Sequence, residues 1–191
     1  MNIQLGRNRV VRRAYGIDEI ALVPGGRTVD PAVTDSSWTL AGVTREIPII
    51  ASAMDGVVDV GVAVELTKLG ALGVLNLEGV QCRYDDPNPV LDRIAAVGKD
   101  EFVPLMQELY SQPVREDLIR SRIAEIKERG GIAAVSATPV AALKFGKAIA
   151  DAGADLFFVQ ATVVSTEHIG PEGQETLDLA TLCRDFGVPV V

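Results

Sequence analysis

The chain has 191 residues, 48% of them hydrophobic, and its 18 basic and 26 acidic side chains give a formal net charge of −8 at pH 7. This composition is typical of a globular domain and argues against a nucleic-acid-binding protein, which draws its affinity from clustered Lys and Arg. No uncharged run reaches the roughly 18 residues that a membrane-spanning helix needs, and the N-terminus lacks the apolar core of a signal peptide. We therefore expect a cytoplasmic protein without a membrane partner.

An alternation of short apolar runs with stretches of helical periodicity begins at residue 47. The segment before it, residues 7–44, contains the turn cluster Pro24-Gly25-Gly26 and is expected to be a cover or a short β lead-in. The apolar runs do not alternate with polar residues, which is typical of parallel strands buried on both faces. Strands are predicted at residues 47–51, 71–76, 132–136 and 156–160, and a fifth starts at Val188.

Two amphipathic helices are predicted directly after the first and third strands. Asp59 is placed to cap the first and Gly70 to end it, and its expected apolar face comprises Val62, Ala63, Leu66 and Leu69. Thr138 and Pro139 occupy the cap and first-turn positions of the second, whose apolar face, ahead of Gly153, comprises Ala141, Phe145, Ala148, Ile149 and Ala152.

Further helical patterns follow the second and fourth strands. The connection from the second strand to the third holds a Pro/Asp turn at residues 85–89 and then helices, of which the last is predicted to be a solvated amphipathic helix. Its inward residues are Ile119, Ile123 and Ile126, and its outward residues are Arg120, Arg122, Glu125, Lys127 and Glu128. After the fourth strand, the apolar stripe ahead of Gly187 comprises Leu179, Leu182, Cys183 and Phe186.

The order of elements predicts an α/β fold with a parallel sheet. A (β/α)8 barrel needs eight strands, whereas a flavodoxin-like sheet ends with five strands and a final helix. The chain holds roughly four βα units and the start of a fifth strand, with no helix after it. We therefore expect residues 1–191 to be the N-terminal part of a single TIM-barrel catalytic domain, inactive alone and dependent on the remainder of the barrel.

In parallel α/β folds the site lies at the carboxyl ends of the strands, so the residues that follow each strand are the candidates. Ser52 and Asp55 can cap the first helix or contact a ligand. Thr138 can likewise cap the second helix or contact a ligand. Gln160, at the end of a buried strand, needs hydrogen-bond partners that a ligand can supply. The other polar residues at strand ends are Asn76, Glu78, Thr162, Ser165, Glu167 and the single histidine, His168.

The two cysteines, Cys82 and Cys183, have no metal-binding spacing, so no metal site is expected. Cys183 lies on an apolar helical stripe and is expected to be buried, while Cys82 lies in a turn-rich region where it can be exposed. The glycine patterns of the Rossmann and P-loop phosphate sites are both missing from the sequence.

Five short motifs, in their order and spacing, resemble the IMP dehydrogenase and GMP reductase family. They are Tyr15-Gly16-Ile17-Asp18, Leu22-Val23-Pro24, Ile47-Pro48-Ile49-Ile50, Ser52-Ala53-Met54-Asp55 and Leu69-Gly70-Ala71-Leu72-Gly73-Val74-Leu75-Asn76. The resemblance implies a (β/α)8 barrel that oxidises IMP to XMP with NAD in guanine nucleotide biosynthesis. It also implies a homotetramer, a monovalent cation such as potassium, and a cysteine that forms a covalent adduct at purine C2.

The resemblance assigns substrate contacts to Ser52, near the phosphate of IMP, and to Met54, against the nucleotide. The Ser-Ala-Met-Asp form is more similar to the dehydrogenases than to the reductases. The alternatives are an NADPH-dependent GMP reductase and a non-catalytic nucleotide-binding barrel. The connection after the second strand is too short for CBS modules, so the chain is most similar to the CBS-less branch, without control through those modules.

Three residues are the expected cofactor contacts: Thr138, Gln160 and Thr162. The chain departs from the family here, because Thr138-Pro139 stands where the family has Thr-His and Gln160 stands where it has an Asp that contacts NAD. A neutral amide loses a charge-assisted hydrogen bond, so we expect NAD affinity or dinucleotide choice to differ. Neither cysteine matches the catalytic loop of the family, so no catalytic residue is assigned and the reactive cysteine is expected beyond residue 191.

Overall fold

The computed structural model describes residues 2–5, 7, 9–161 and 178–191, and the chain forms two compact units, Met1–Asp35 and Ser36–Val191. In the first unit, β1 (Asn2–Leu5) pairs antiparallel with β2 (Arg9–Arg12), and two short 3-10 turns follow, η1 (Ile17–Glu19) and η2 (Pro31–Val33). All residues of this unit whose burial is described are exposed. The expected β lead-in therefore contains a hairpin and two short 3-10 turns.

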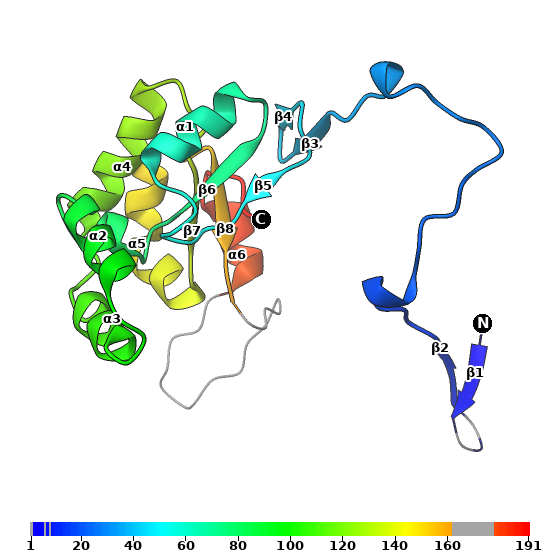
Figure 1. Cartoon of the computed structure of the whole chain (residues 1–191), viewed down its shortest axis with the longest axis horizontal. Coiled ribbons are helices and arrows are strands. Elements are labelled where there is room, and N and C mark those ends of the chain that lie inside the picture. The colour runs from blue at the N-terminus through cyan, green and yellow to red at the C-terminus, as the bar shows by residue number, and fades with distance from the viewer. Residues whose placement is uncertain (1, 6, 8, 162–177) are drawn as a thin grey trace. The chain divides into compact units, whose positions relative to one another are not determined.

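The second unit is built on a parallel sheet in the order β5-β6-β7-β8 (Figure 1). Its strands are β5 (Ile50–Ala51), β6 (Leu72–Asn76), β7 (Ala134–Ala137) and β8 (Leu156–Val159). Val190 forms a parallel bridge with Phe157 on the free side of β8, where a fifth strand begins. Four of the predicted strands are confirmed, the first of them shortened to two residues, and the fifth is represented by this single bridge. The parallel order is that of a partial (β/α) barrel.

The two faces of the sheet are covered by different elements (Figure 1). Helices α1 (Val60–Lys68), α4 (Glu116–Glu128) and α5 (Pro139–Asp151) pack on one face around buried residues such as Leu75, Val135 and Phe157. On the opposite face, Trp38 and Val43 of the antiparallel hairpin of β3 (Trp38–Leu40) and β4 (Val43–Arg45) pack against the cluster that contains Leu72 and Val74. Val74 and Phe158 also line a cavity. The Trp38 indole N–H donates to the Ile47 carbonyl at 2.7 Å, which fixes the hairpin beside the entry to β5.

The predicted helix caps are present. The Asp59 carboxylate accepts a hydrogen bond from the Val62 amide at 2.7 Å, and the Thr138 hydroxyl accepts one from the Ala141 amide at 3.4 Å. Gly70, directly after α1, has a φ of +86°, which a residue with a side chain rarely adopts.

One predicted apolar face is rotated. In α1 the buried residues are Val60, Ala63 and Val64, whereas Val62 and Leu69 are exposed. Val62 lines a cavity shared with α2 (Asn88–Ala96) instead of facing the sheet. The helix thus has two apolar surfaces, one that faces the sheet and one that carries Val62 and faces the cavity. Periodicity alone cannot tell which of the two faces the sheet.

The connection between β6 and β7 contains η3 (Val80–Cys82), α2, α3 (Phe102–Tyr110) and α4. Ile119, Ile123 and Ile126 of α4 are buried as expected. After β8, α6 (Leu179–Asp185) contains no fully buried residue. Within the described part of the chain, none of the helices has the length and apolar character needed to cross a membrane.

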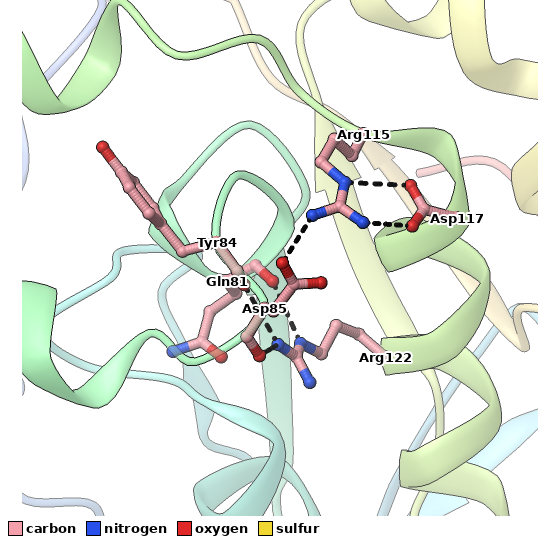
Figure 2. Close-up of polar contacts among 6 residues, drawn as sticks. All are labelled: Gln81, Tyr84, Asp85, Arg115, Asp117 and Arg122. Atoms are coloured by element: carbon pink, nitrogen blue, oxygen red, sulfur yellow. Dashed lines mark hydrogen bonds and ion pairs between the residues drawn. The ribbon is translucent and has the colours of Figure 1, made fainter.

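Arg122 is not outward-facing, so that prediction was wrong. Its side chain is only 12% exposed and donates hydrogen bonds to the carbonyls of Gln81 at 3.0 Å, Tyr84 at 3.3 Å and Asp85 at 2.8 Å (Figure 2). These carbonyls lie where the chain leaves η3 and turns toward α2, and a guanidinium supplies several donors in one plane. Arg122 therefore fixes the start of the long connection to α4.

Arg122→Ala is expected to lower the free energy of unfolding of the full-length protein by about 2–4 kcal/mol, because three carbonyls lose a charged donor. The matched control is Arg120→Ala, which breaks exposed ion pairs to Glu116 and Asp151 and is expected to cost about 0–1 kcal/mol. Urea denaturation measures both. Equal losses for the two variants would contradict the role assigned to Arg122.

Candidate functional site

The carboxyl ends of β5, β6, β7 and β8 lie at one edge of the sheet because the four strands are parallel. The segments that follow them start at Ser52, Leu77, Thr138 and Gln160. Residues far apart in the sequence therefore meet at this edge. Two adjoining cavities open there, and Ala53 lines both of them.

The smaller cavity, of about 340 Å³, is lined by Ser52, Ser136, Gln160 and apolar residues of β5, β6 and β8. Ser136 is 1% exposed, and its hydroxyl donates to the side-chain oxygen of Gln160 at 3.1 Å. The amide oxygen of Gln160 thus has a protein partner, which leaves the amide N–H groups as the donors available to a ligand. Ser52 is exposed on the same cavity.

The larger cavity, of about 770 Å³, lies between the segment after β5 and the helices α2 and α3. Met54 lines it and is 55% exposed. Polar groups of Asp55, Asn76 and Tyr110 lie among its mostly apolar walls. Ser52 and Met54, the two predicted substrate contacts, therefore lie in one segment but line neighbouring cavities.

Thr138, which follows β7, is bound by a carboxylate from the segment that follows the neighbouring strand β6. The two side-chain oxygens of Glu78 accept hydrogen bonds from the Thr138 hydroxyl at 3.1 Å and the Thr138 amide at 2.5 Å. This places a negative charge at the N-terminus of α5, where it is favourable. The Thr138 hydroxyl is engaged by Glu78 and by the helix cap, and its predicted contact with a cofactor stays a prediction. The pairing with Glu78 was not foreseen.

Asp55 and Ser52 do not cap α1, because Asp59 does. Asp55 instead accepts hydrogen bonds on Oδ2 from the Val80 amide at 2.9 Å and from the Tyr110 hydroxyl. Its Oδ1 is buried without a hydrogen-bond partner. Burial, and then the bond to Asp55, raise the pKa of Tyr110, so the phenol stays protonated and donates. Sequence reasoning missed Tyr110, because it belongs to a helix far along the chain from Asp55.

Gly79 allows the Asp55 carboxylate to approach. A Cβ atom on Gly79 would lie 1.7 Å from Asp55 Oδ1, which is far inside van der Waals contact. The backbone of Gly79 has an ordinary φ of −86°, so the requirement for glycine there is one of space.

Both cysteine expectations were wrong. Cys82 is fully buried against the helix-facing core, and burial raises the pKa of its thiol to about 12. Cys183 is exposed, since α6 places only part of its stripe against the sheet. Cys82 therefore cannot supply a thiolate near neutral pH. The described residues contain no group of three or more side chains able to hold a metal ion.

Thr162, Ser165, Glu167 and His168 lie outside the described residues. The predicted role of Thr162 as a cofactor contact stays a prediction.

A family model described as the IMP dehydrogenase / GMP reductase domain matches residues 14–168. An uncharacterized oxidoreductase of Mycobacterium leprae is 36% identical, and another of Mycolicibacterium smegmatis is 34% identical; each alignment covers 99% of this chain and 52% of the relative. The chain thus spans about half the length of these relatives. An inosine-5'-monophosphate dehydrogenase of Methanocaldococcus jannaschii is 43% identical over 65 residues, which are 34% of this chain and 13% of that protein.

A solved structure is similar over the same extent. The crystal structure of an IMP dehydrogenase/GMP reductase-like protein from Corynebacterium glutamicum matches with a TM-score of 0.85 and 27% identity. The match covers 99% of this chain and 50% of that one. The partial barrel seen here therefore corresponds to about half of that chain.

Gly79→Ala is expected to lower the free energy of unfolding by about 1–3 kcal/mol, because the added methyl group displaces the Asp55 carboxylate. Gly98→Ala is the control, since nothing lies within 4 Å of a Cβ at that position and its φ is not positive. Urea denaturation of the full-length protein measures both. A Gly79→Ala variant as stable as the control would show that Asp55 does not occupy this position.

The native full-length protein is expected to leave Cys82 unmodified by iodoacetamide near pH 8, while Cys183 reacts. The raised pKa keeps Cys82 protonated at this pH and burial excludes the reagent, and the reactive thiolate fraction rises only as pH approaches about 12. Peptide mapping by mass spectrometry reads both sites, and labelling in urea confirms that both peptides are detectable. Labelling of Cys82 as fast as Cys183 would contradict its burial.

Proposed function

This chain belongs to the IMP dehydrogenase/GMP reductase family, and from that premise we propose that the protein is an oxidoreductase that converts IMP to XMP with NAD. The curated relatives that match nearly the whole chain are described as oxidoreductases. The residues described here would supply one side of the nucleotide site.

The observation that carries this proposal is the position of the Ser52–Met54 segment. It follows β5 at the carboxyl edge of the sheet, where sites of barrel enzymes lie. The two cavities that it lines have volumes of about 340 and 770 Å³. Both volumes lie within the usual size range of small-molecule sites, about 300–1,000 Å³. In the proposed complex, Ser52 donates to the phosphate of IMP and Met54 packs against the nucleotide.

The residues at this edge also fit a dinucleotide. Gln160 presents amide N–H groups at the smaller cavity, held in place by the bond from buried Ser136. These groups can donate to a ribose hydroxyl or to a carboxamide oxygen. When bound, NAD would accept the hydride from the purine, and the role proposed for Gln160 is to orient it.

The covalent nucleophile is proposed to lie outside residues 1–191. Cys82 is buried with a raised pKa, and Cys183 lies on α6 and lines neither of the two cavities at the carboxyl edge. The described residues would therefore bind and orient the reactants and would not form the bond to the purine.

Gln160 is also compatible with a second candidate, an NADPH-dependent GMP reductase. A neutral amide stands where the resemblance to the family implies an aspartate that contacts NAD. A neutral amide at that position makes no charge-assisted hydrogen bond to a ribose hydroxyl, so this residue does not itself select NAD over NADP. The same nucleotide cavity would serve either substrate.

The full-length protein is expected to reduce NAD in the presence of IMP, as measured by the absorbance of the reduced nicotinamide. Ser52→Ala is expected to raise the KM for IMP about tenfold, because a hydrogen bond to a charged phosphate is lost. GMP with NADPH is the second assay. Turnover with that pair alone would select the reductase, and no turnover or nucleotide binding with either pair would contradict the proposal.

A further inference from the structure

The helices α2 and α3 form a small layer of their own at the carboxyl edge of the sheet. They pack around Val80, Val90 and Leu109, a cluster of buried residues separate from the two clusters on the faces of the sheet. This layer forms one wall of the larger cavity, opposite the segment that carries Met54. Its attachment to the rest of the unit therefore decides the shape of that cavity.

Arg83 fixes the end of α3. Its guanidinium donates to the carbonyl of Glu78 at 2.8 Å, to that of Tyr110 at 3.0 Å, and to that of Gln112. The same guanidinium lies over the Tyr110 ring, 5.4 Å from the ring centroid. Tyr110 is thus held through both its backbone and its ring, so its hydroxyl has a defined position.

That hydroxyl donates to Asp55 Oδ2, which also accepts from the Val80 amide. The other oxygen of this carboxylate is buried without a partner. Asp55 is half-buried, and a carboxylate with an oxygen removed from water is costly unless it is hydrogen-bonded, so Asp55 depends strongly on these two donors. Only Tyr110 supplies its donor from the α2–α3 layer.

Asp55 lies within a short, internally bonded segment. The Met54 amide donates to the Ser52 carbonyl at 2.8 Å, and the Val57 and Val58 amides donate to the Met54 carbonyl at 2.9 and 3.0 Å. A displacement of Asp55 therefore moves Met54 and Ser52 with it. The hydrogen bond from Tyr110 therefore acts on Ser52 and Met54, the proposed nucleotide contacts, through Asp55.

We propose that Tyr110 is a positioning residue: through its hydrogen bond to Asp55 it holds residues 52–57 in the geometry that binds the purine nucleotide. The part of this inference that concerns substrate rests on the proposed function. The part that concerns how firmly residues 52–57 are held in one conformation is argued from the contacts of the ligand-free chain alone.

The first test is the kinetics of Tyr110→Phe in the full-length protein. This change keeps the ring under Arg83 and removes only the donor to Asp55. The KM for IMP is expected to rise about tenfold while kcat changes less than threefold, because binding geometry is lost and the reacting groups are untouched.

The matched control is Tyr84→Phe. The Tyr84 hydroxyl donates to the Leu109 carbonyl at 2.9 Å, within the same layer, and does not reach Asp55. A purely structural role for tyrosine hydroxyls in this layer predicts similar KM values for both variants, and that result would overturn the proposal. The proposal predicts a KM within twofold of wild type for Tyr84→Phe.

Amide hydrogen exchange tests the inference without any substrate. Exchange at Met54, Val57 and Val80 is expected to be about tenfold faster in Tyr110→Phe and unchanged in Tyr84→Phe. If the wild-type protein binds no purine monophosphate, the proposed function fails and this experiment still decides the role of Tyr110. Unchanged exchange in Tyr110→Phe would overturn that role.

Asp55→Asn provides a second variant should Tyr110→Phe fail to fold. It keeps the shape of the side chain and an acceptor for Tyr110 and Val80, but removes the charge. Faster exchange at the same amides than in the wild-type protein is expected. Exchange identical to that of wild type would count against the proposal.

Discussion

The parallel pairing of β5, β6, β7 and β8 is the constraint on which the rest of the molecule depends. Parallel strands place all their carboxyl ends at one edge, so segments separated by most of the chain meet there. Helices pack on one face of this sheet, and the β3–β4 hairpin packs against part of the other. Two cavities open at the carboxyl edge, and Asp55, Ser136 and Gln160 are among the polar residues that line them.

Long-range polar contacts then connect the ends of neighbouring strands. Glu78, after β6, binds Thr138, after β7, and Asp55, after β5, accepts from Tyr110 at the end of α3. Arg83 links these two contacts, because it donates to the carbonyls of both Glu78 and Tyr110. The segments at the edge are thus bonded to one another. Glu78 accepts a hydrogen bond from the backbone amide of Thr138, and Asp55 accepts one from the backbone amide of Val80.

Much of the fold could be predicted from the sequence, because strands and helix caps depend on residues that are close together in the sequence. Apolar runs predicted the four strands of the parallel sheet, and Asp59 and Thr138 predicted two helix starts. The family resemblance, confirmed by the family model, pointed to the segment at Ser52. The features that could not be predicted depend on partners distant in sequence. Helical periodicity placed Arg122 on the solvent side of its helix. In the structure Arg122 binds three carbonyls of η3 and the turn after it, which the pattern of the helix does not show. Tyr110 gave no local signal for the same reason.

The central claim is that a purine nucleoside monophosphate binds at the carboxyl edge of this sheet, against the segment that follows β5. A crystal structure of the full-length protein with IMP tests it most directly. The expected result is a phosphate within hydrogen-bond distance of the Ser52 hydroxyl and a purine in contact with Met54. A nucleotide bound elsewhere, with the cavities at Ser52 and Met54 free of it, would contradict the claim.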